Sequence, residues 1–392
     1  MKKYLYPANF LIPKTNFDKW AVIACDQYTS DKKYWAQVEE KVGDSPSTLR
    51  LTLPEIYLGE TDERIVKINS SMNKYLDEGV FETVTDSMIY IERELVGGAV
   101  RKGILGAIDL TEYEYEAGKK ALTRATEQTV AERIPPRVKI RKDAPLEFPH
   151  VLVFIDDPED TVIGSVNKEY LKKLYDFELM QNGGHIEGYK VETDLQDKIN
   201  DALAGLVKDG FLFAVGDGNH SLATAKECYK LNGTESSRYA LVEIVNIHNP
   251  AIEFEPIYRV LLGADKKDVI AYLKKRNADK VGEALHTFDI SDKNGTEKLS
   301  LVPTSKLPVG TLQAYLDDYL KENPNVAIDY IHGTEEVERL CRDENAVGFI
   351  FDGMEKSELF SAVDQDGSLP RKTFSMGHAD DKRFYIEGRR IK

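Results

Sequence analysis

Residues 211–233 specify a strand, a glycine turn and a helix in immediate succession. Residues 211–215 form a short unbroken apolar run, which is typical of a strand buried on both faces. The turn has the sequence Gly216-Asp217-Gly218-Asn219-His220-Ser221. Helical spacing follows at Leu222, Ala225 and Tyr229, and Asn232-Gly233 is a helix stop signal. The fold must therefore place a buried strand directly before a helix, with this turn between them.

The composition of the turn predicts an anion site. The first N–H groups of a helix have no partner within it, and the helix dipole favours negative charge at that end. We expect Gly216, Gly218, Asn219 and Ser221 to bind a phosphate. Asp217 is the candidate base or magnesium ligand, and His220 is the candidate acid, base or phosphate donor.

A purely structural role for the turn is the alternative. The two glycines then supply positive φ for a tight connection, and Asp217 or Asn219 caps the helix.

The rest of the chain indicates a two-lobed α+β or mixed α/β protein, with mixed sheets flanked by helices. Residues 31–42 and 62–79 have helical patterns, and the apolar runs 88–95 and 103–110 resemble a hairpin. The proline-marked segment 144–149 predicts a boundary between an N-terminal mixed lobe, 1–149, and a C-terminal α/β lobe, 150–392, that carries the turn. Helical and strand-like runs alternate in the second lobe, and Thr193 with Gln196 predicts a capping box for a helix that ends before residue 209.

Charge and cysteine usage restrict the partners. With 392 residues, a net charge of -15 and 30% charged positions, the chain is expected to be a soluble cytoplasmic protein. The acidic excess argues against a nucleic-acid partner, and no apolar run is long enough for a membrane span. The N-terminal apolar stretch is interrupted by prolines before it reaches signal-peptide length. Three scattered cysteines argue against structural zinc.

A basic run in this acidic chain is a second candidate feature. Arg124, Arg133 and Arg137 are candidates for a clamp on a phosphate or carboxylate. The alternative is a solvated face on which Glu127 and Glu132 pair with these cations. Glu127 is also a candidate for supporting the site, and His185, in a glycine-rich loop, is a candidate second imidazole beside His220.

Three segments resemble one family. The segments 215–221 and 249–259 and the arginine-bearing run 124–137 are similar, in order, to domain of unknown function family 1015, and the likeness covers most of the chain. The family's loop usually has the sequence Asp-Gly-His-His-Arg, which is similar to the phosphate loop of the ParB and sulfiredoxin superfold, including its free serine kinases. Asp217, Gly218 and His220 match that loop, whereas Asn219 replaces a histidine and Ser221 replaces the arginine. The resemblance implies phosphate binding and serine or phosphoserine as a substrate, and the lost arginine weakens the expectation of a nucleotide.

Three functions remain as hypotheses. The first is a phosphotransfer enzyme, a phosphatase or kinase acting on a small metabolite, best assigned to serine or phosphoserine metabolism, with Mg²⁺ as the expected ion. The second is a non-catalytic regulatory protein that binds a nucleotide or phosphometabolite. The third is a metal-dependent hydrolase that uses Asp217, His220 and His185.

Overall fold

The computed structural model describes residues 2–129, 134–343, 345–377 and 379–392. The chain divides into two compact units. Unit 1 comprises Met1–Ala125, Thr129–Ile252 and Gly377–Lys392, and unit 2 comprises Thr126–Gln128 and Glu253–Met376. Within the described residues, no helix combines the length and the apolar composition that a membrane span requires.

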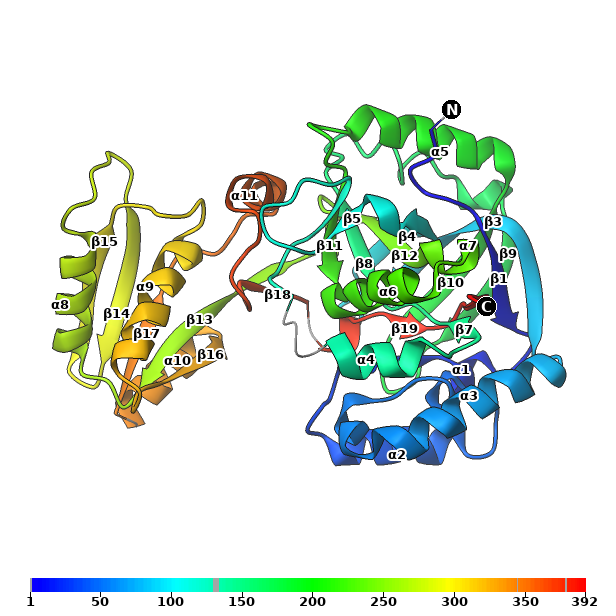
Figure 1. The fold of residues 1–392 in the computed structure, drawn as a ribbon, viewed down its shortest axis with the longest axis horizontal. Helices are drawn as coiled ribbons and strands as arrows, with labels where there is room; N and C mark the ends of the chain where they lie inside the picture. The colour runs from blue at the N-terminus through cyan, green and yellow to red at the C-terminus, as the bar shows by residue number, and fades with distance from the viewer. Residues whose placement is uncertain (1, 130–133, 344, 378) are drawn as a thin grey trace. The chain divides into compact units, whose positions relative to one another are not determined.

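Unit 1 is built on a mixed sheet (Figure 1). Its strands, in spatial order, are β5 (Tyr113–Glu114), β6 (Thr123–Ala125), β11 (Phe213–Asp217), β8 (Leu152–Ile155), β12 (Tyr239–Asn246), β4 (Val100–Asp109), β3 (Phe81–Glu94), β10 (His185–Val191) and β9 (Lys172–Glu178), with β1 (Ala8–Pro13) paired to β3. The pairs β5–β6, β6–β11 and β8–β12 are parallel. The neighbouring pair β11–β8 is antiparallel, as are those from β12 to β9.

Hydrophobic clusters cover both faces of this sheet. Met88 and Tyr90 belong to one cluster, whereas Ile89 and Ile91 belong to the other, because successive side chains of a strand point to opposite faces. Helices α5 (Thr193–Leu206) and α6 (Asn219–Asn232) contribute to the first cluster, and α2 (Lys32–Val42) contributes to the second. A third cluster includes residues of α3 (Thr61–Asp77). The expected architecture of mixed sheets flanked by helices is therefore confirmed.

Unit 2 contains an antiparallel sheet. Its strands, in spatial order, are β15 (Gly295–Leu301), β14 (His286–Asp292), β17 (Ala346–Ile350), β13 (Phe254–Leu262) and β16 (Ala327–His332), with β18 (Phe374–Met376) paired to β13. Its longer helices are α8 (Lys266–Asn277), α9 (Pro308–Glu322), α10 (Thr334–Asp343) and α11 (Leu359–Asp366).

Two expectations from the sequence differ from the structure. The compact units do not follow a boundary at residues 149/150, because β12 and β4, from opposite sides of that point, pair in one sheet. The segment 144–149 is therefore a connection inside unit 1. The capping box is also absent at α5: the N-cap is Glu192, so Thr193 is already helical, and the Gln196 amide instead donates to the carbonyl groups of Asp86 and Val191.

Candidate functional site

The predicted strand, glycine turn and helix are present in unit 1. Strand β11 ends at Asp217, α6 begins at Asn219, and Gly218 between them has a φ of 81°. Residues that carry a side chain rarely adopt this left-handed backbone conformation, so glycine is the favoured residue here. Gly216 has a different reason: a Cβ there would lie 2.4 Å from a ring carbon of Phe154. Local backbone conformation and packing therefore explain both glycines, whatever the turn binds.

Asp217 does not act as a side-chain cap of the helix. Gly218 occupies the N-cap position, and the Oδ1 atom of Asp217 accepts a hydrogen bond of 3.0 Å from the N–H of Gly218. Its Oδ2 atom is buried and accepts no hydrogen bond from the residues that the structure describes, and the Nζ of Lys382 lies 3.4 Å away. A carboxylate with an unused acceptor atom next to a cation is available for proton transfer or ion binding.

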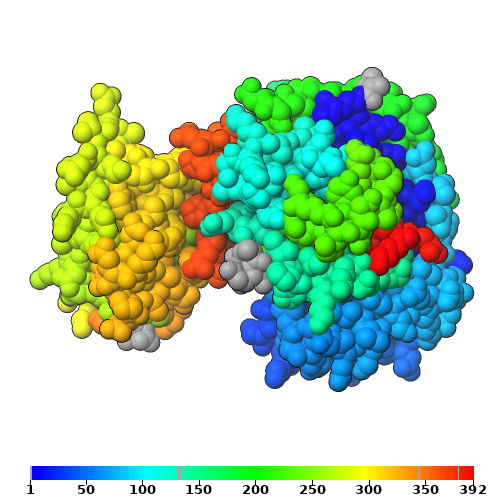
Figure 2. Space-filling view, in the orientation of Figure 1, coloured from blue at the N-terminus to red at the C-terminus, as the bar shows by residue number. Residues whose placement is uncertain are grey.

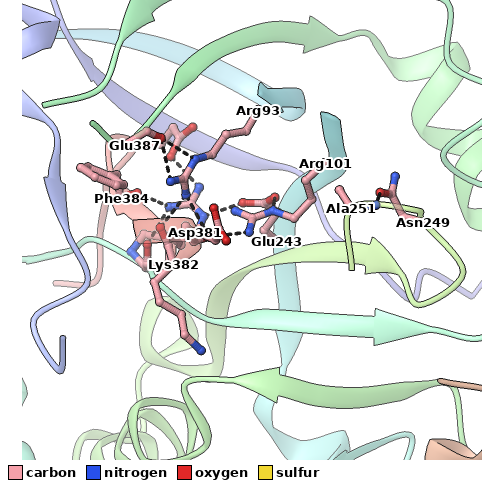
Figure 3. A network of polar contacts seen from close by, with 12 residues as sticks. Arg93, Arg101, Glu243, Asn249, Ala251, Asp381, Lys382, Phe384 and Glu387 are labelled. Atoms are coloured by element: carbon pink, nitrogen blue, oxygen red, sulfur yellow. Dashed lines mark hydrogen bonds and ion pairs between the residues drawn. The ribbon is translucent and has the colours of Figure 1, made fainter. Parts of the chain in front are cut away.

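Lys382 is a site residue that the sequence patterns did not single out. Residues 380–387 bring it to Asp217. Buried arginines hold that segment in place (Figure 3). Arg101, on β4, donates a 2.8 Å hydrogen bond to the carbonyl of Asp381. Arg383 pairs with the carboxylates of Glu243 and Glu387, each at 2.7 Å. The neighbours of Lys382 on both sides are therefore anchored in the interior, which fixes where its own side chain can reach.

The next residues, Asn219, His220 and Ser221, form the first turn of α6 and are half-buried. The carbonyl of His220 accepts a 2.7 Å hydrogen bond from Thr224. The Oγ of Ser221 lies 3.2 Å from the Nε2 of His150. His150 was not a sequence candidate because a single histidine after a proline carries no recognisable pattern.

The two described arginines of the run, Arg124 and Arg137, lie on different elements of unit 1. Arg124 lies on β6, beside β11, with its guanidinium 4.1 Å from the ring centre of Phe211 and its Nε donating to the carbonyl of Ala121. Arg137 lies on α4 (Ile134–Arg141) and forms an ion pair with Glu55. Arg133 and Glu132 lie outside the described residues.

Helix α4 packs beside α6, as Figure 1 shows. The last residues of α6, from Lys230 to Asn232, are exposed, and the light green region around α6 forms part of the surface in Figure 2.

His185 does not lie beside His220. It is on β10, and β8, β12, β4 and β3 separate that strand from β11, so at the usual strand spacing the two strands are roughly 24 Å apart. The two rings cannot form one site, and the metal-dependent hydrolase that required both is not supported. Glu127 belongs to unit 2, where its backbone bridges to Leu369.

His185 instead belongs to an ionic cluster on the two strands at this end of the sheet. Its nitrogens lie 2.9 Å from carboxylate oxygens of Glu178 and Asp176. Burial alone would lower the pKa of His185, but these two carboxylates outweigh it and raise the pKa. A carboxylate oxygen of Glu187 lies within 4.8 Å of a carboxylate oxygen of Asp176 and of a ring nitrogen of His185. Glu187 already forms ion pairs with Lys168 and Lys173. The cluster is an ion-pair network.

The fold and the site together define a mixed α/β protein with an anion-compatible turn between β11 and α6. The chain belongs to the family described as protein of unknown function (DUF1015), whose model matches residues 5–379. No curated protein matches the sequence.

Several solved structures show a distant similarity of fold. A conserved hypothetical protein from Pyrococcus furiosus is 12% identical, covers 73% of this chain and 95% of its own, and gives a TM-score of 0.39. A free serine kinase variant in complex with AMP is 14% identical, with 72% and 90% coverage and a TM-score of 0.42. SbnI from Staphylococcus aureus, truncated at its C-terminus, is 9% identical, with 72% and 82% coverage and a TM-score of 0.37.

Proposed function

We propose that the protein is a phosphotransfer enzyme that acts on a small hydroxylated or phosphorylated metabolite. The observation that carries this proposal is the pair of Asp217 and Lys382 at the start of α6. The helix end and the lysine favour a phosphate, and the carboxylate with an unused oxygen can accept a proton from a hydroxyl group. A structural turn alone does not require these two charged groups together.

The individual roles follow from position. The turn residues Gly216, Gly218, Asn219 and Ser221 bind the phosphate, and His220 exchanges a proton with it. Lys382 supplies the positive charge that the family's loop arginine would provide. We assign this role to Lys382 because its Nζ lies 3.4 Å from the Asp217 carboxylate, whereas the guanidinium of Arg124 contacts the Phe211 ring and that of Arg137 pairs with Glu55.

Magnesium fits the same arrangement. The buried Oδ2 of Asp217 offers one carboxylate oxygen, and Mg²⁺ is commonly held by one or two carboxylates together with substrate phosphates. When bound, the ion would neutralise charge on the transferred group. Asp217 would then hold the ion and His220 would carry the proton.

Turnover of defined substrates tests the proposal. Purified protein is incubated with magnesium and a panel of phosphometabolites that includes phosphoserine, with phosphate release as the readout. A parallel assay measures phosphorylation of serine with ADP or ATP. Serine and phosphoserine come first because the loop resembles that of free serine kinases.

Two variants and a matched control link turnover to the turn. Asp217→Asn and His220→Ala should each lower the turnover rate by about 100-fold or more, the usual contribution of an acid or base, with a nearly unchanged melting temperature. Asp209→Asn makes the same chemical change at an exposed turn before β11 and should retain full turnover. Unfolding of both site variants would support the structural role of the turn. Binding of a nucleotide or phosphometabolite without any turnover would establish the regulatory alternative, and no binding at all would refute both.

A further inference from the structure

A cavity of about 160 Å³ lies in unit 1, next to α6. This volume is similar to that of a cavity that accommodates benzene, at about 150 Å³. The charged side chains of its lining form the ion pairs Arg137–Glu55 and Arg141–Glu147. Most of the remaining lining is apolar and includes Leu51, Leu53, Met72, Ile140, Phe148 and Leu222.

One part of the cavity lining is polar and forms a continuous chain of hydrogen bonds. The Oγ of Ser221 lies 3.2 Å from the Nε2 of His150, and the Nδ1 of His150 lies 2.9 Å from the hydroxyl of Tyr385. His150 and Tyr385 are buried, and all three residues line the cavity. A hydroxyl, an imidazole and a third group that orients the imidazole form the arrangement by which proteins activate a serine nucleophile.

The surroundings of Tyr385 are compatible with a basic Nε2 on His150. Burial raises the pKa of Tyr385 well above its ordinary value, so its hydroxyl keeps its proton. The tyrosine oxygen accepts a 3.1 Å hydrogen bond from the N–H of Cys25. Because a hydroxyl oxygen has two lone pairs, the tyrosine oxygen can also accept the Nδ1 proton of His150. The Nε2 atom then accepts the hydroxyl proton of Ser221.

The carboxylate of Asp26 belongs to the electrostatic surroundings of His150. Burial acts to raise the pKa of Asp26, but the positive charge of His150 and a hydrogen bond from Gln27 lower it below its ordinary value. Asp26 is therefore negatively charged near neutral pH. Ser221 is the third residue of α6, so negative charge that develops beside it also lies near the positive end of the helix dipole.

From this geometry we propose that Ser221, activated by His150, is a nucleophile toward small esters whose acyl group is apolar and about the size of benzene. The Oγ of Ser221 forms a bond to the acyl carbon, and its proton passes to the Nε2 of His150. The bond from the acyl carbon to the alcohol oxygen breaks, and that oxygen takes the proton from His150. Water then attacks the acyl carbon in the same way, which releases the carboxylic acid and restores Ser221.

This activity does not depend on phosphate transfer. Both proposed reactions involve Ser221, but the phosphotransfer also depends on Asp217 and Lys382, which do not line the cavity. An Asp217→Asn variant that loses phosphotransfer and retains ester hydrolysis would separate the two reactions.

Covalent labelling tests the nucleophile directly. Phenylmethanesulfonyl fluoride carries a benzene-sized group and a sulfur centre that serine nucleophiles attack with loss of fluoride. Intact-mass and peptide analysis should find one adduct, on Ser221, and p-nitrophenyl benzoate should be hydrolysed. Ser221→Ala should remove both signals, while Ser165→Ala, at an exposed serine whose hydroxyl donates to a backbone carbonyl, should retain both.

The role of His150 requires a readout that folding alone would not change. His150→Ala should lower the labelling rate by about 100-fold or more, which is the usual contribution of a general base. Free imidazole should restore part of that rate by occupying the space left by the ring. If His150→Ala does not fold, Tyr385→Phe provides the second test: it removes the hydroxyl that orients the ring and should also slow labelling.

Three results would overturn the proposal. The first is a folded wild-type protein in which Ser221 is not labelled and the ester is not hydrolysed. The second is a labelling rate of Ser221 that does not change in folded His150→Ala. The third is a loss of labelling in that variant that imidazole does not restore although a small aromatic ligand still binds the cavity.

Discussion

Replacing Gly216 with alanine tests whether packing against Phe154 fixes the backbone of the turn. The added Cβ would lie 2.4 Å, 2.7 Å and 2.8 Å from three carbon atoms of that ring. Carbon atoms prefer separations of about 3.5–4.0 Å, so the ring would have to move by about 1 Å. Phe154 is 0% exposed and lies on β8, in the interior of the sheet. Overpacking of this kind costs about 1–3 kcal/mol, and we expect the free energy of unfolding to fall by that amount.

Tryptophan fluorescence during urea unfolding measures the change in the free energy of unfolding of unit 1, which contains Gly216. The chain has two tryptophans, Trp20 and Trp35, and both are buried in unit 1, so their emission reports the unfolding of that unit. Gly205→Ala is the matched control: it lies in α5, and an added Cβ meets no atom within 4 Å. The control should be neutral or stabilising by up to about 1 kcal/mol. A Gly216→Ala variant within about 0.5 kcal/mol of wild type would refute the packing argument.

Three further predictions concern charged groups. Lys382→Gln should weaken binding of inorganic phosphate by about tenfold, or about 1.4 kcal/mol, in calorimetric titration, and unchanged affinity would remove Lys382 from the site. Arg383→Met leaves the buried carboxylates of Glu243 and Glu387 without this cation and should lower the free energy of unfolding by about 3–5 kcal/mol in urea, whereas a loss below about 1 kcal/mol would contradict the network's role. The raised pKa of His185 stabilises the fold below its unfolded pKa of about 6.5, and this contribution disappears as pH rises through the folded pKa. In thermal unfolding, His185→Gln should therefore cost about 0.5–1 kcal/mol near pH 5.5 and nothing near pH 9, and an equal loss at both would exclude this explanation.

The order of many elements could be predicted because it depends on local pattern. The apolar run and stop signals predicted β11 and α6, and the structure ends α6 at Asn232 with Gly233 in a left-handed conformation. The helical patterns at 31–42 and 62–79 correspond to α2 and α3. Hydrophobic periodicity determines such elements because it records which face of each one is buried.

The partners of these elements could not be predicted in the same way. Periodicity shows that a strand is buried and does not show which strand lies beside it. The lobe boundary predicted from the prolines of segment 144–149 was therefore wrong, because β12 pairs with β4 across it. In the same way, the position of β10 in the sheet separates His185 from His220.

The turn at residues 216–221 shows which of its properties the sequence determined and which the tertiary structure determined. The sequence alone set its backbone course, because Gly218 permits the left-handed conformation that the chain requires between strand and helix. Only the tertiary structure decided its chemistry. It brings Lys382 to Asp217, and it brings His150, 71 residues from Ser221 along the chain, to the serine hydroxyl. Long-range contacts of this kind arise from the packing of separate elements around a common core, and no local pattern encodes them.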